Sequence, residues 1–421
     1  MRSLPPRVAP GVRRVLLLGV LTAGCSSSGG AVQQHAPRSE RAEPPDAGTT
    51  AAPDGGASDA GLAETPDDGG AEVPVGELRA EDVHCGVGHC CAILNDKTVR
   101  CWGRNWAGQL GDGTTQDRNR PVIVRLPRQK AVPVQLTGYG NECVRMSDGT
   151  AWCWGEDVGG ELNNGATESR STPVQVVGLR DARQIAAGWL LTCATLGDGT
   201  ARCWGYIPGS NVANGTTTPA DGLRDVIEIS IGMAHGCARL GDGTAKCWGG
   251  NVAGELGVGF KSYGRAMPPW PVVNLKGAVH LAVGGRQSCV VLEDQTVSCW
   301  GWNEQCQLGD GTRVHRYQPT PVRGLQNVVQ LALDYSSSCA RTQEGVVFCW
   351  GLVHVPHATK PVHSCYPRPV PGLSSVAQIT AGAVICARKT DGGVLCWGQN
   401  DRGELGDGTN ELRSHPVLVQ W

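Results

Sequence analysis

Short apolar segments alternate with polar turns along most of the chain, in an order that recurs every 44–52 residues. Residues 184–188 form an apolar run that ends in small residues, and a second apolar segment follows at 193–196. A turn built on Asp-Gly, the strongest short hairpin signal, connects it to a third segment that ends in Cys-Trp-Gly at 203–205. A Pro-Val run, such as 173–176, lies near the end of each unit. The pattern predicts four short strands in each unit.

The tripeptide Cys-Trp-Gly occurs seven times, and another cysteine stands ten positions before each copy. Four strands in about 50 residues, repeated seven times, predict an all-β fold, namely a seven-bladed β-propeller of four-stranded blades. A solenoid of stacked strands is the main alternative, but it usually has shorter repeats and needs distinct caps, which the sequence does not show.

The paired cysteines raise a choice between a redox site, a metal site and a structural disulfide. In the hairpin register that pairs Cys193 with Cys203, residues 197–199 form the loop and the two cysteines lie directly opposite each other on antiparallel strands, close to disulfide range. Redox enzymes use Cys-x-x-Cys and zinc sites use closely spaced pairs, and neither spacing occurs in these pairs. We therefore predict seven disulfides within blades: Cys91–Cys101, Cys143–Cys153, Cys193–Cys203, Cys237–Cys247, Cys289–Cys299, Cys339–Cys349 and Cys386–Cys396.

The residues that follow Cys-Trp-Gly carry a resemblance to a known family. Residues 103–111, 249–257 and 398–406 resemble the G-x-N-x-x-G-[QE]-L-G signature of the regulator of chromosome condensation repeat. The resemblance extends over seven units from about residue 78 to 421, although the units at 205 and 351 lose the signature and Cys306 replaces its central glycine in another. It implies a seven-bladed β-propeller, here of an exported, disulfide-stapled bacterial branch, and it indicates architecture more than role.

The first 24 residues are predicted to be a lipoprotein signal peptide. Arginines precede the apolar run 15–21, which is too short to span a bilayer. Residues 21–25, Leu-Thr-Ala-Gly-Cys, resemble the bacterial lipobox, which implies that Cys25 bears the lipid. Ser26, where aspartate would mark another sorting route, indicates an exported protein that is anchored to the bacterial outer membrane.

Residues 25–75 are predicted to be a disordered acidic linker rich in Ala, Pro and Gly. Residues 26–75 hold nine carboxylates against two arginines and no aromatic residue, so they cannot bury enough apolar surface to fold. The propeller, residues 76–421, is close to neutral, and this balance gives no electrostatic case for binding nucleic acid.

Several residues suggest a metal site, but each group has a simpler interpretation. His84, Cys85, His89 and Cys90 are interpreted as a buried thiol and a loop histidine beside the first hairpin. His354, His357, His363 and Cys365 lie in one irregular segment, where a disulfide between Cys306 and Cys365 is favoured over zinc or copper. The Leu-Gly-Asp-Gly-Thr segments at 110–114, 308–312 and 405–409 supply one carboxylate each, too few for calcium, and fit turn chemistry.

These observations favour a non-enzymatic binding or scaffold module that contacts a protein or glycan through loops on one face. We expect a monomer without cofactor or metal, whose only membrane contact is the lipid anchor. The alternatives are an extracellular hydrolase with a site at the propeller axis, a secreted inhibitor of another enzyme and a rigid spacer. The candidate contact residues, which lie in variable loops, are Trp106, Tyr206, Trp302, His354 and His357.

Overall fold

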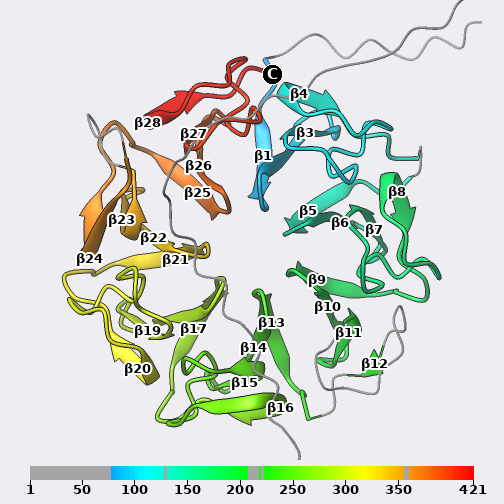
Figure 1. Cartoon of the computed structure of the whole chain (residues 1–421). Helices are drawn as coiled ribbons and strands as arrows, with labels where there is room; N and C mark the ends of the chain where they lie inside the picture. The colour runs from blue at the N-terminus through cyan, green and yellow to red at the C-terminus, as the bar shows by residue number, and fades with distance from the viewer. Residues whose placement is uncertain (1–76, 128–129, 207–217, 220–221, 355–359) are drawn as a thin grey trace, which may run out of the picture. The chain divides into compact units, whose positions relative to one another are not determined.

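The computed structural model describes residues 77–127, 130–206, 218–219, 222–354 and 360–421. Within these ranges the chain forms 28 β-strands, arranged as seven antiparallel four-stranded sheets around a central axis (Figure 1). The predicted all-β, seven-bladed propeller is confirmed. A search of the same residues finds no helix with the length and hydropathy needed to cross a membrane.

Each blade is a meander of consecutive strands. Blades 1 to 4 comprise β1 (Ala80–Cys85), β2 (His89–Leu94), β3 (Val99–Gly103), β4 (Arg118–Ile123); β5 (Pro133–Gly138), β6 (Asn141–Met146), β7 (Ala151–Gly155), β8 (Arg170–Gln175); β9 (Ala182–Ala187), β10 (Leu191–Leu196), β11 (Ala201–Gly205), β12 (Thr218–Pro219); and β13 (Val226–Ile231), β14 (His235–Leu240), β15 (Ala245–Asn251), β16 (Ser262–Pro271). Blades 5 to 7 comprise β17 (Ala278–Val283), β18 (Gln287–Leu292), β19 (Val297–Gly301), β20 (Arg316–Pro321); β21 (Val328–Leu333), β22 (Ser337–Thr342), β23 (Val347–Val353), β24 (Val362–Pro369); and β25 (Val376–Ala381), β26 (Val384–Lys389), β27 (Val394–Gly398), β28 (Arg413–Leu418).

The order of strands sets which loops share a face. The first strand of each blade lies innermost, beside the axis, and the fourth lies at the rim (Figure 1). Because successive strands are antiparallel, the loop between strands one and two and the loop between strands three and four leave the same end of the blade. We call this end the loop face. The Asp-Gly turns between strands two and three lie at the opposite end.

Those turns explain the hairpin register. The backbone N–H and the hydroxyl of Thr200 donate to Asp198 Oδ1 at 2.9 and 2.6 Å, and Gly199 has a φ of +76°, which disfavours other residues. Cys193 then lies directly opposite Cys203, as predicted. The same register places the leading and following cysteines of all seven blades opposite each other.

Disulfides join these opposite cysteines on strands two and three. In each of the seven pairs the Cα atoms are 4.0–4.1 Å apart. Another disulfide joins Cys306, in the loop before β20, to Cys365 on β24 of the next blade. This last bond connects two blades, whereas the seven others each close one hairpin.

The interpretation of Cys85 as a buried free thiol is wrong. Cys85 ends β1, lies opposite Cys90 on β2 and forms a disulfide with it. The loop between them is so short that the two cysteines are cross-strand neighbours, which is the geometry of the seven other hairpins. His89 is likewise not a loop residue, because it begins β2 and is completely buried.

The ring closes by packing between blade 7 and blade 1. Each of these blades is complete in sequence order, so no strand crosses from one to the other. The backbone N–H of Ala383 donates to the Gly86 carbonyl at 3.1 Å, and the rings of Trp102 and Trp421 pack edge to face, 5.8 Å apart. The last residue of the chain therefore belongs to the closing interface.

Buried tryptophans form the contacts between neighbouring blades. The indole N–H of Trp154 donates to the carbonyl oxygen of Gln109 in the preceding blade. Trp102, Trp204, Trp300 and Trp350 make the same bond to Glu404, Glu161, Glu255 and Gln307. In each case the acceptor is the Gln or Glu position of the repeat signature, so Cys-Trp-Gly in one blade recognises the signature of the blade before it.

The side chains of the signature hold its own loop. Asn105 Oδ1 accepts the Leu110 N–H at 2.9 Å, and Gln109 Oε1 accepts the Ala107 N–H at 2.9 Å. Asn251 and Glu255 repeat both bonds in blade 4. The signature residues thus stabilise the loop and the contact between blades, which accounts for their recurrence in the sequence.

Candidate functional site

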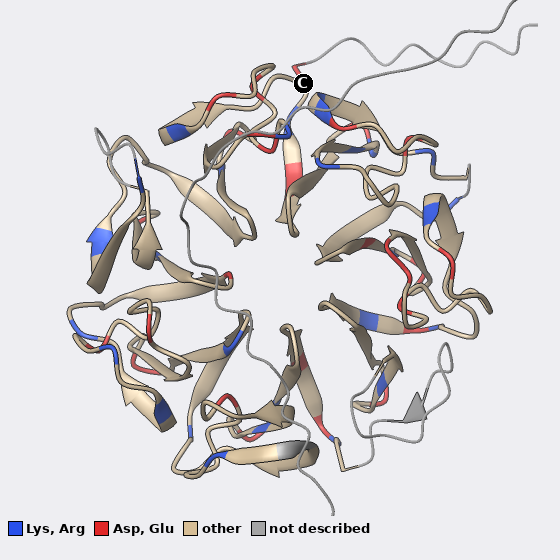
Figure 2. Ribbon diagram, viewed as in Figure 1, with Lys and Arg blue, Asp and Glu red and all other residues tan. Residues whose placement is uncertain are grey.

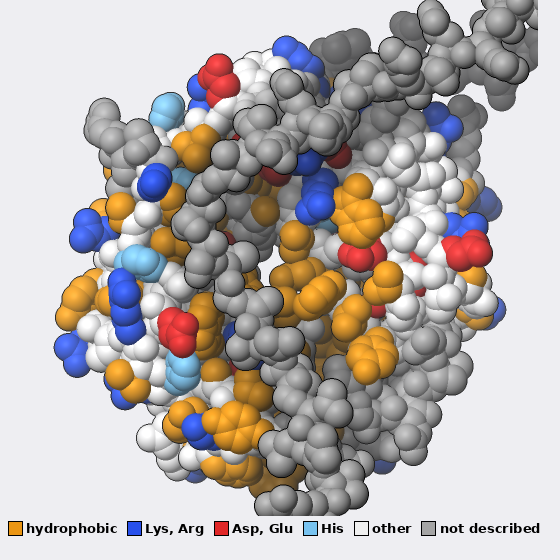
Figure 3. Space-filling model, viewed as in Figure 1, with side chains coloured by type: hydrophobic (Ala, Val, Ile, Leu, Met, Phe, Trp, Pro, Cys, Tyr) orange, Lys and Arg blue, Asp and Glu red, His pale blue; other side chains and the backbone are white. Residues whose placement is uncertain are grey.

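Large apolar side chains are exposed on the loop face around the axis. The loops between strands one and two supply Trp189 and Tyr335, each 43% exposed. The segments after strand three supply Trp106, Val158 and Tyr206, which are 52, 60 and 47% exposed. We call these five residues the crown. Figure 3 shows hydrophobic side chains gathered around the central opening on the face that it displays.

Two neighbours fix the orientation of crown residues. The Arg104 guanidinium lies 5.6 Å from the ring centre of Trp106, in cation–π range. The ring of Trp302 packs against that of Tyr335, with centroids 5.4 Å apart. Contacts of this kind hold the rings in place while leaving part of each ring open to a partner.

The structure brings some of the predicted contact residues together and not others. Trp106 and Tyr206 belong to the crown, and half-buried Trp302 supports it. His354 is half-buried and lines a separate cavity of about 360 Å³ between blades 6 and 7, together with His415 and Trp397. His357 lies outside the described residues.

The sequence analysis missed Trp189 and Tyr335. Both stand four positions before the leading cysteine of their blade, where the other units have Val87, Tyr139, Met233, Gly285 and Gly382. An alignment of the seven units would have shown that this position varies from glycine to tryptophan, while the position before it is glycine in five of the units. Variation at an exposed loop position beside a constant framework is the signal that could have found them.

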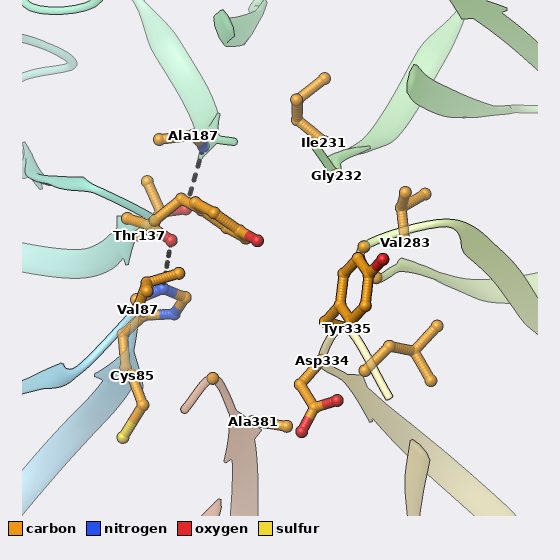
Figure 4. A pocket seen from close by; sticks show the side chains of 18 of the residues that line it. Cys85, Val87, Thr137, Ala187, Ile231, Gly232, Val283, Asp334, Tyr335 and Ala381 are labelled. Carbon is orange, nitrogen blue, oxygen red and sulfur yellow. Dashed lines mark hydrogen bonds between the residues drawn. The ribbon is translucent and has the colours of Figure 1, made fainter. Parts of the chain in front are cut away.

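A cavity of about 330 Å³ opens at the axis within the crown. Its wall consists mostly of the ends of the innermost strands, with small and aliphatic side chains such as Val87, Ile231 and Val283 (Figure 4). The polar side chains of the wall are those of His84, Thr137, Tyr139, Ser230, Asp334, Tyr335 and Ser336.

Asp334 supplies the one carboxylate among the residues described as lining this cavity. Its Oδ1 accepts the N–H groups of Ser336 and Ser337 at 2.5 and 2.6 Å, and its Oδ2 accepts the Ser337 hydroxyl at 2.8 Å. Burial raises the pKa of Asp334, whereas these hydrogen bonds lower it. Burial, followed by the negative charges of Asp334 and Tyr335, raises the pKa of Tyr139 to about 12.

His84 is held by the next blade. Its Nε2 lies 2.9 Å from the carbonyl oxygen of Gly138, so this nitrogen carries the hydrogen. A histidine nitrogen that donates to a carbonyl cannot at the same time accept a proton from a serine. His84 therefore positions two blades relative to each other.

A second polar group is buried between blades 1 and 2. His89 Nε2 and Glu142 Oε2 are 3.2 Å apart, and neither side chain is exposed. Burial lowers the pKa of His89 to about 4 and raises that of Glu142 to about 8. The pair therefore holds one proton over a wide pH range.

Two groups of described side chains have the spacing of metal ligands. One is Cys85, Cys90 and Cys386, and the other is His89, Cys91 and Glu142. Every cysteine in both groups is in a disulfide, and a disulfide sulfur lacks the thiolate charge that binds a metal. Neither group fits a metal in this state.

The Leu-Gly-Asp-Gly-Thr segments are turns. Asp112 Oδ1 accepts the N–H and the hydroxyl of Thr114, and its Oδ2 accepts from the Arg118 guanidinium at 3.1 Å. Burial alone would raise the pKa of Asp112, but these hydrogen bonds hold it below the ordinary value. Asp310 and Asp407 are bound in the same way by Arg316 and Arg413.

Charge is dispersed over the ring. Lys and Arg are interspersed with Asp and Glu, and the innermost strands carry few of either (Figure 2). Along the described chain, Lys and Arg therefore form no continuous stripe of the kind typical of nucleic-acid binding.

Comparison with known families agrees with this geometry. Residues 148–195, 296–340 and 391–421 match the Regulator of chromosome condensation (RCC1) repeat, and residues 81–109 match a second description of the same repeat. The chain carries RCC1 repeats. RCC1-repeat relatives include the ultraviolet-B receptor UVR8 of Arabidopsis thaliana, 30% identical over 114 residues, which are 27% of this chain and 26% of UVR8. The E3 ubiquitin-protein ligase HERC2 of Homo sapiens is 30% identical over 101 residues, 24% of this chain and 2% of HERC2.

Solved structures share the fold over a longer stretch. Yeast RCC1 (Prp20), solved bound to Kap60, superposes with a TM-score of 0.68 at 20% identity, covering 76% of this chain and 83% of that one. Human WBSCR16 superposes with a TM-score of 0.66 at 21% identity, covering 77% and 94%. These two structures support the propeller fold of the described chain.

Proposed function

We propose that this RCC1-repeat protein is a binding module that captures a protein partner through the crown. The observation that carries the proposal is the gathering of Trp106, Trp189, Tyr206 and Tyr335 at exposed positions of one face. Tryptophan and tyrosine are enriched in protein interfaces and dominate their binding energy. Exposed aromatic surface is costly in water, and a partner that covers it removes this cost.

The lining of the axis supports binding over hydrolysis. The usual glycosidases place two carboxyl groups on either side of the bond they cleave. Among the described residues that line the axial cavity, Asp334 is the one carboxylate, and neighbouring N–H and hydroxyl groups already bind it.

The proposed setting is the bacterial envelope. Disulfides join all eighteen cysteines that the structure describes, a density typical of an oxidising compartment. We place Cys25 as the lipidated residue, with residues 25–75 as the tether that holds the propeller away from the outer membrane. The fold is also that of Prp20, which has been solved in complex with another protein, Kap60.

The test is capture of partners from an envelope extract of the bacterium that makes the protein. The full oxidised chain and a crown variant, Trp106→Ser with Trp189→Ser and Tyr335→Ser, are immobilised, and bound proteins are quantified by mass spectrometry. A rim variant, Tyr263→Ser with Trp270→Ser, is the matched control, because these rings are 70 and 45% exposed on β16.

We expect a partner that the wild-type chain and the rim variant recover equally and that the crown variant loses by about tenfold or more. Equal recovery by all three chains would reject the crown as the binding surface. If a glycan array binds the wild-type chain and no protein is recovered, the partner is a glycan and the protein-binding proposal fails.

A further inference from the structure

At one position in the wall of the axial cavity, blade 6 carries a charged side chain where the other blades have glycine or alanine. The position five before the leading cysteine is glycine in blades 1 to 5, namely Gly86, Gly138, Gly188, Gly232 and Gly284, and it is Ala381 in blade 7. Blade 6 has Asp334 there. Its backbone does what the glycines do, since its carbonyl oxygen accepts the Gly285 N–H at 3.0 Å. Its side chain is therefore an addition to the ring that blade packing does not require.

Among the described residues, no Lys or Arg is bound to the Asp334 carboxylate. The groups that bind it are two backbone N–H groups and serine hydroxyls, all uncharged. The described lining of the cavity contains no Lys or Arg. A half-buried carboxylate without a counter-ion makes the cavity favourable for a positive charge.

Aromatic rings surround the same space. Figure 4 shows the Asp334 carboxylate beside Ala381 and the Tyr335 ring lying along the cavity wall toward Val283. Tyr139, from blade 2, lines it as well, and the charge of Asp334 reaches its hydroxyl. The faces of tyrosine rings attract organic cations, more strongly where water is excluded. Apolar walls formed by Ile231, Val283 and neighbouring residues suit the alkyl part of such a cation.

We propose that the axial cavity is a binding site for an organic cation, an alkylammonium group whose charge faces Asp334 between Tyr139 and Tyr335. At about 330 Å³ the cavity lies at the small end of ligand pockets, so it fits a single head group with a short chain. The group belongs either to a free small amine or to a lysine side chain of a polypeptide. The site shares Tyr335 with the crown, whereas Asp334 and Tyr139 belong to the cavity alone, so substitution of Asp334 tests the site separately.

The test is calorimetric titration of the full oxidised chain with choline and with 3,3-dimethylbutan-1-ol, its uncharged isostere of the same shape. We expect choline to bind at least about tenfold more tightly than the alcohol. Equal affinity, or no heat with choline and with n-butylammonium, would overturn the proposal.

Variants then locate the site. Asp334→Asn keeps a side-chain oxygen for the N–H groups of Ser336 and Ser337, so the loop is preserved while the charge is lost. We expect it to weaken choline binding about tenfold, and Tyr335→Leu to weaken it severalfold by an independent route. Glu156→Gln is the matched control, because this half-buried carboxylate lies on the loop face outside the cavity and its loss should leave the affinity unchanged. Equal loss with Glu156→Gln would show general surface electrostatics and overturn the site.

Two peptides distinguish the sources of the cation. Gly-Gly-Lys-Gly-Gly is titrated beside the same peptide with norleucine, which lacks the charge. Tighter binding of the lysine peptide than of n-butylammonium indicates a polypeptide ligand, and the reverse indicates a free amine. Either order supports the site, whereas binding of the norleucine peptide as tightly as the lysine peptide contradicts it.

Discussion

The indole nitrogen of Trp154 donates a hydrogen bond of 2.7 Å to the carbonyl oxygen of Gln109 in the preceding blade. Trp154 is completely buried, so its indole N–H cannot bind water and needs a hydrogen-bond partner within the protein. The Gln109 carbonyl is that partner. Because the bond recurs around the ring, it explains why the Cys-Trp-Gly tripeptide and the repeat signature occur together.

Replacing Trp154 with phenylalanine should lower the free energy of unfolding by about 2–3 kcal/mol, since it leaves the Gln109 carbonyl unpaired and opens a small void. Chemical denaturation measures the change. Trp152→Phe is the control two residues away, because its indole nitrogen has no hydrogen-bond partner among the described residues. Equal destabilisation by both substitutions would contradict the role given to the interblade bond.

Cys193 and Cys203 close one hairpin, so removing their disulfide should destabilise the protein without changing its fold. The double variant Cys193→Ser with Cys203→Ser should lose about 2–3 kcal/mol of unfolding free energy, less if the hairpin also persists in the unfolded chain. Denaturation with circular dichroism checks both expectations. A variant as stable as the wild type would show that this bond does not contribute.

The Cys85–Cys90 disulfide can be tested against an alternative pairing, because the adjacent residue Cys91 is the other cysteine within reach in sequence. Peptide mapping of the non-reduced protein by mass spectrometry should find Cys85 linked to Cys90 and Cys91 linked to Cys101. Free thiols at Cys85 and Cys90, or a bond between Cys85 and Cys91, would contradict the register of β1 and β2.

The buried pair of His89 and Glu142 should make stability depend on pH. In the unfolded chain both groups have released their protons above about pH 6.5. The folded pair keeps one proton up to about pH 8, the folded pKa of Glu142. The folded state thus binds more protons, and unfolding free energy should fall by about 1–2 kcal/mol as pH rises from 6.5 to 8.

The same pair sets an opposite slope in acid. Below the ordinary pKa of glutamate, His89 and Glu142 together bind two protons in the unfolded chain. In the folded protein they bind one proton until the pH falls to about 4, where His89 becomes protonated. Denaturation of the wild type and of Glu142→Gln across pH 4 to 8 isolates the contribution, since other groups cancel in the difference. If the difference between the two proteins does not change between pH 6.5 and 8, the pair does not retain its proton.

Cys25 provides a test of the proposed anchor. The variant Cys25→Ser should move from the membrane fraction to the soluble fraction of the envelope and lose incorporation of labelled palmitate. A variant that stays in the membrane fraction with its label would show that another residue bears the lipid.

The spacing of Cys-Trp-Gly and the Asp-Gly turns was enough to predict the blades, because both belong to the hairpin whose register repeats seven times. The Cys85–Cys90 bond was missed because cysteines occupy these two opposite positions of β1 and β2 in blade 1 alone, so no repeat revealed the pair. Trp189 and Tyr335 were not predicted, because the residue type at their position varies among the seven units. They come together only when the blades close into the propeller. Asp334 could not be assigned a place at the axis until the innermost strands were seen to meet there.

The central claim is that a partner binds over the crown, and hydrogen exchange of the complex tests it most directly. With the captured partner bound, amides in residues 104–108, 188–190 and 334–336 should exchange more slowly, whereas the turns at 95–98, 147–150 and 197–200 on the opposite face should not change. Protection of those turns with no change in the crown loops would contradict the account.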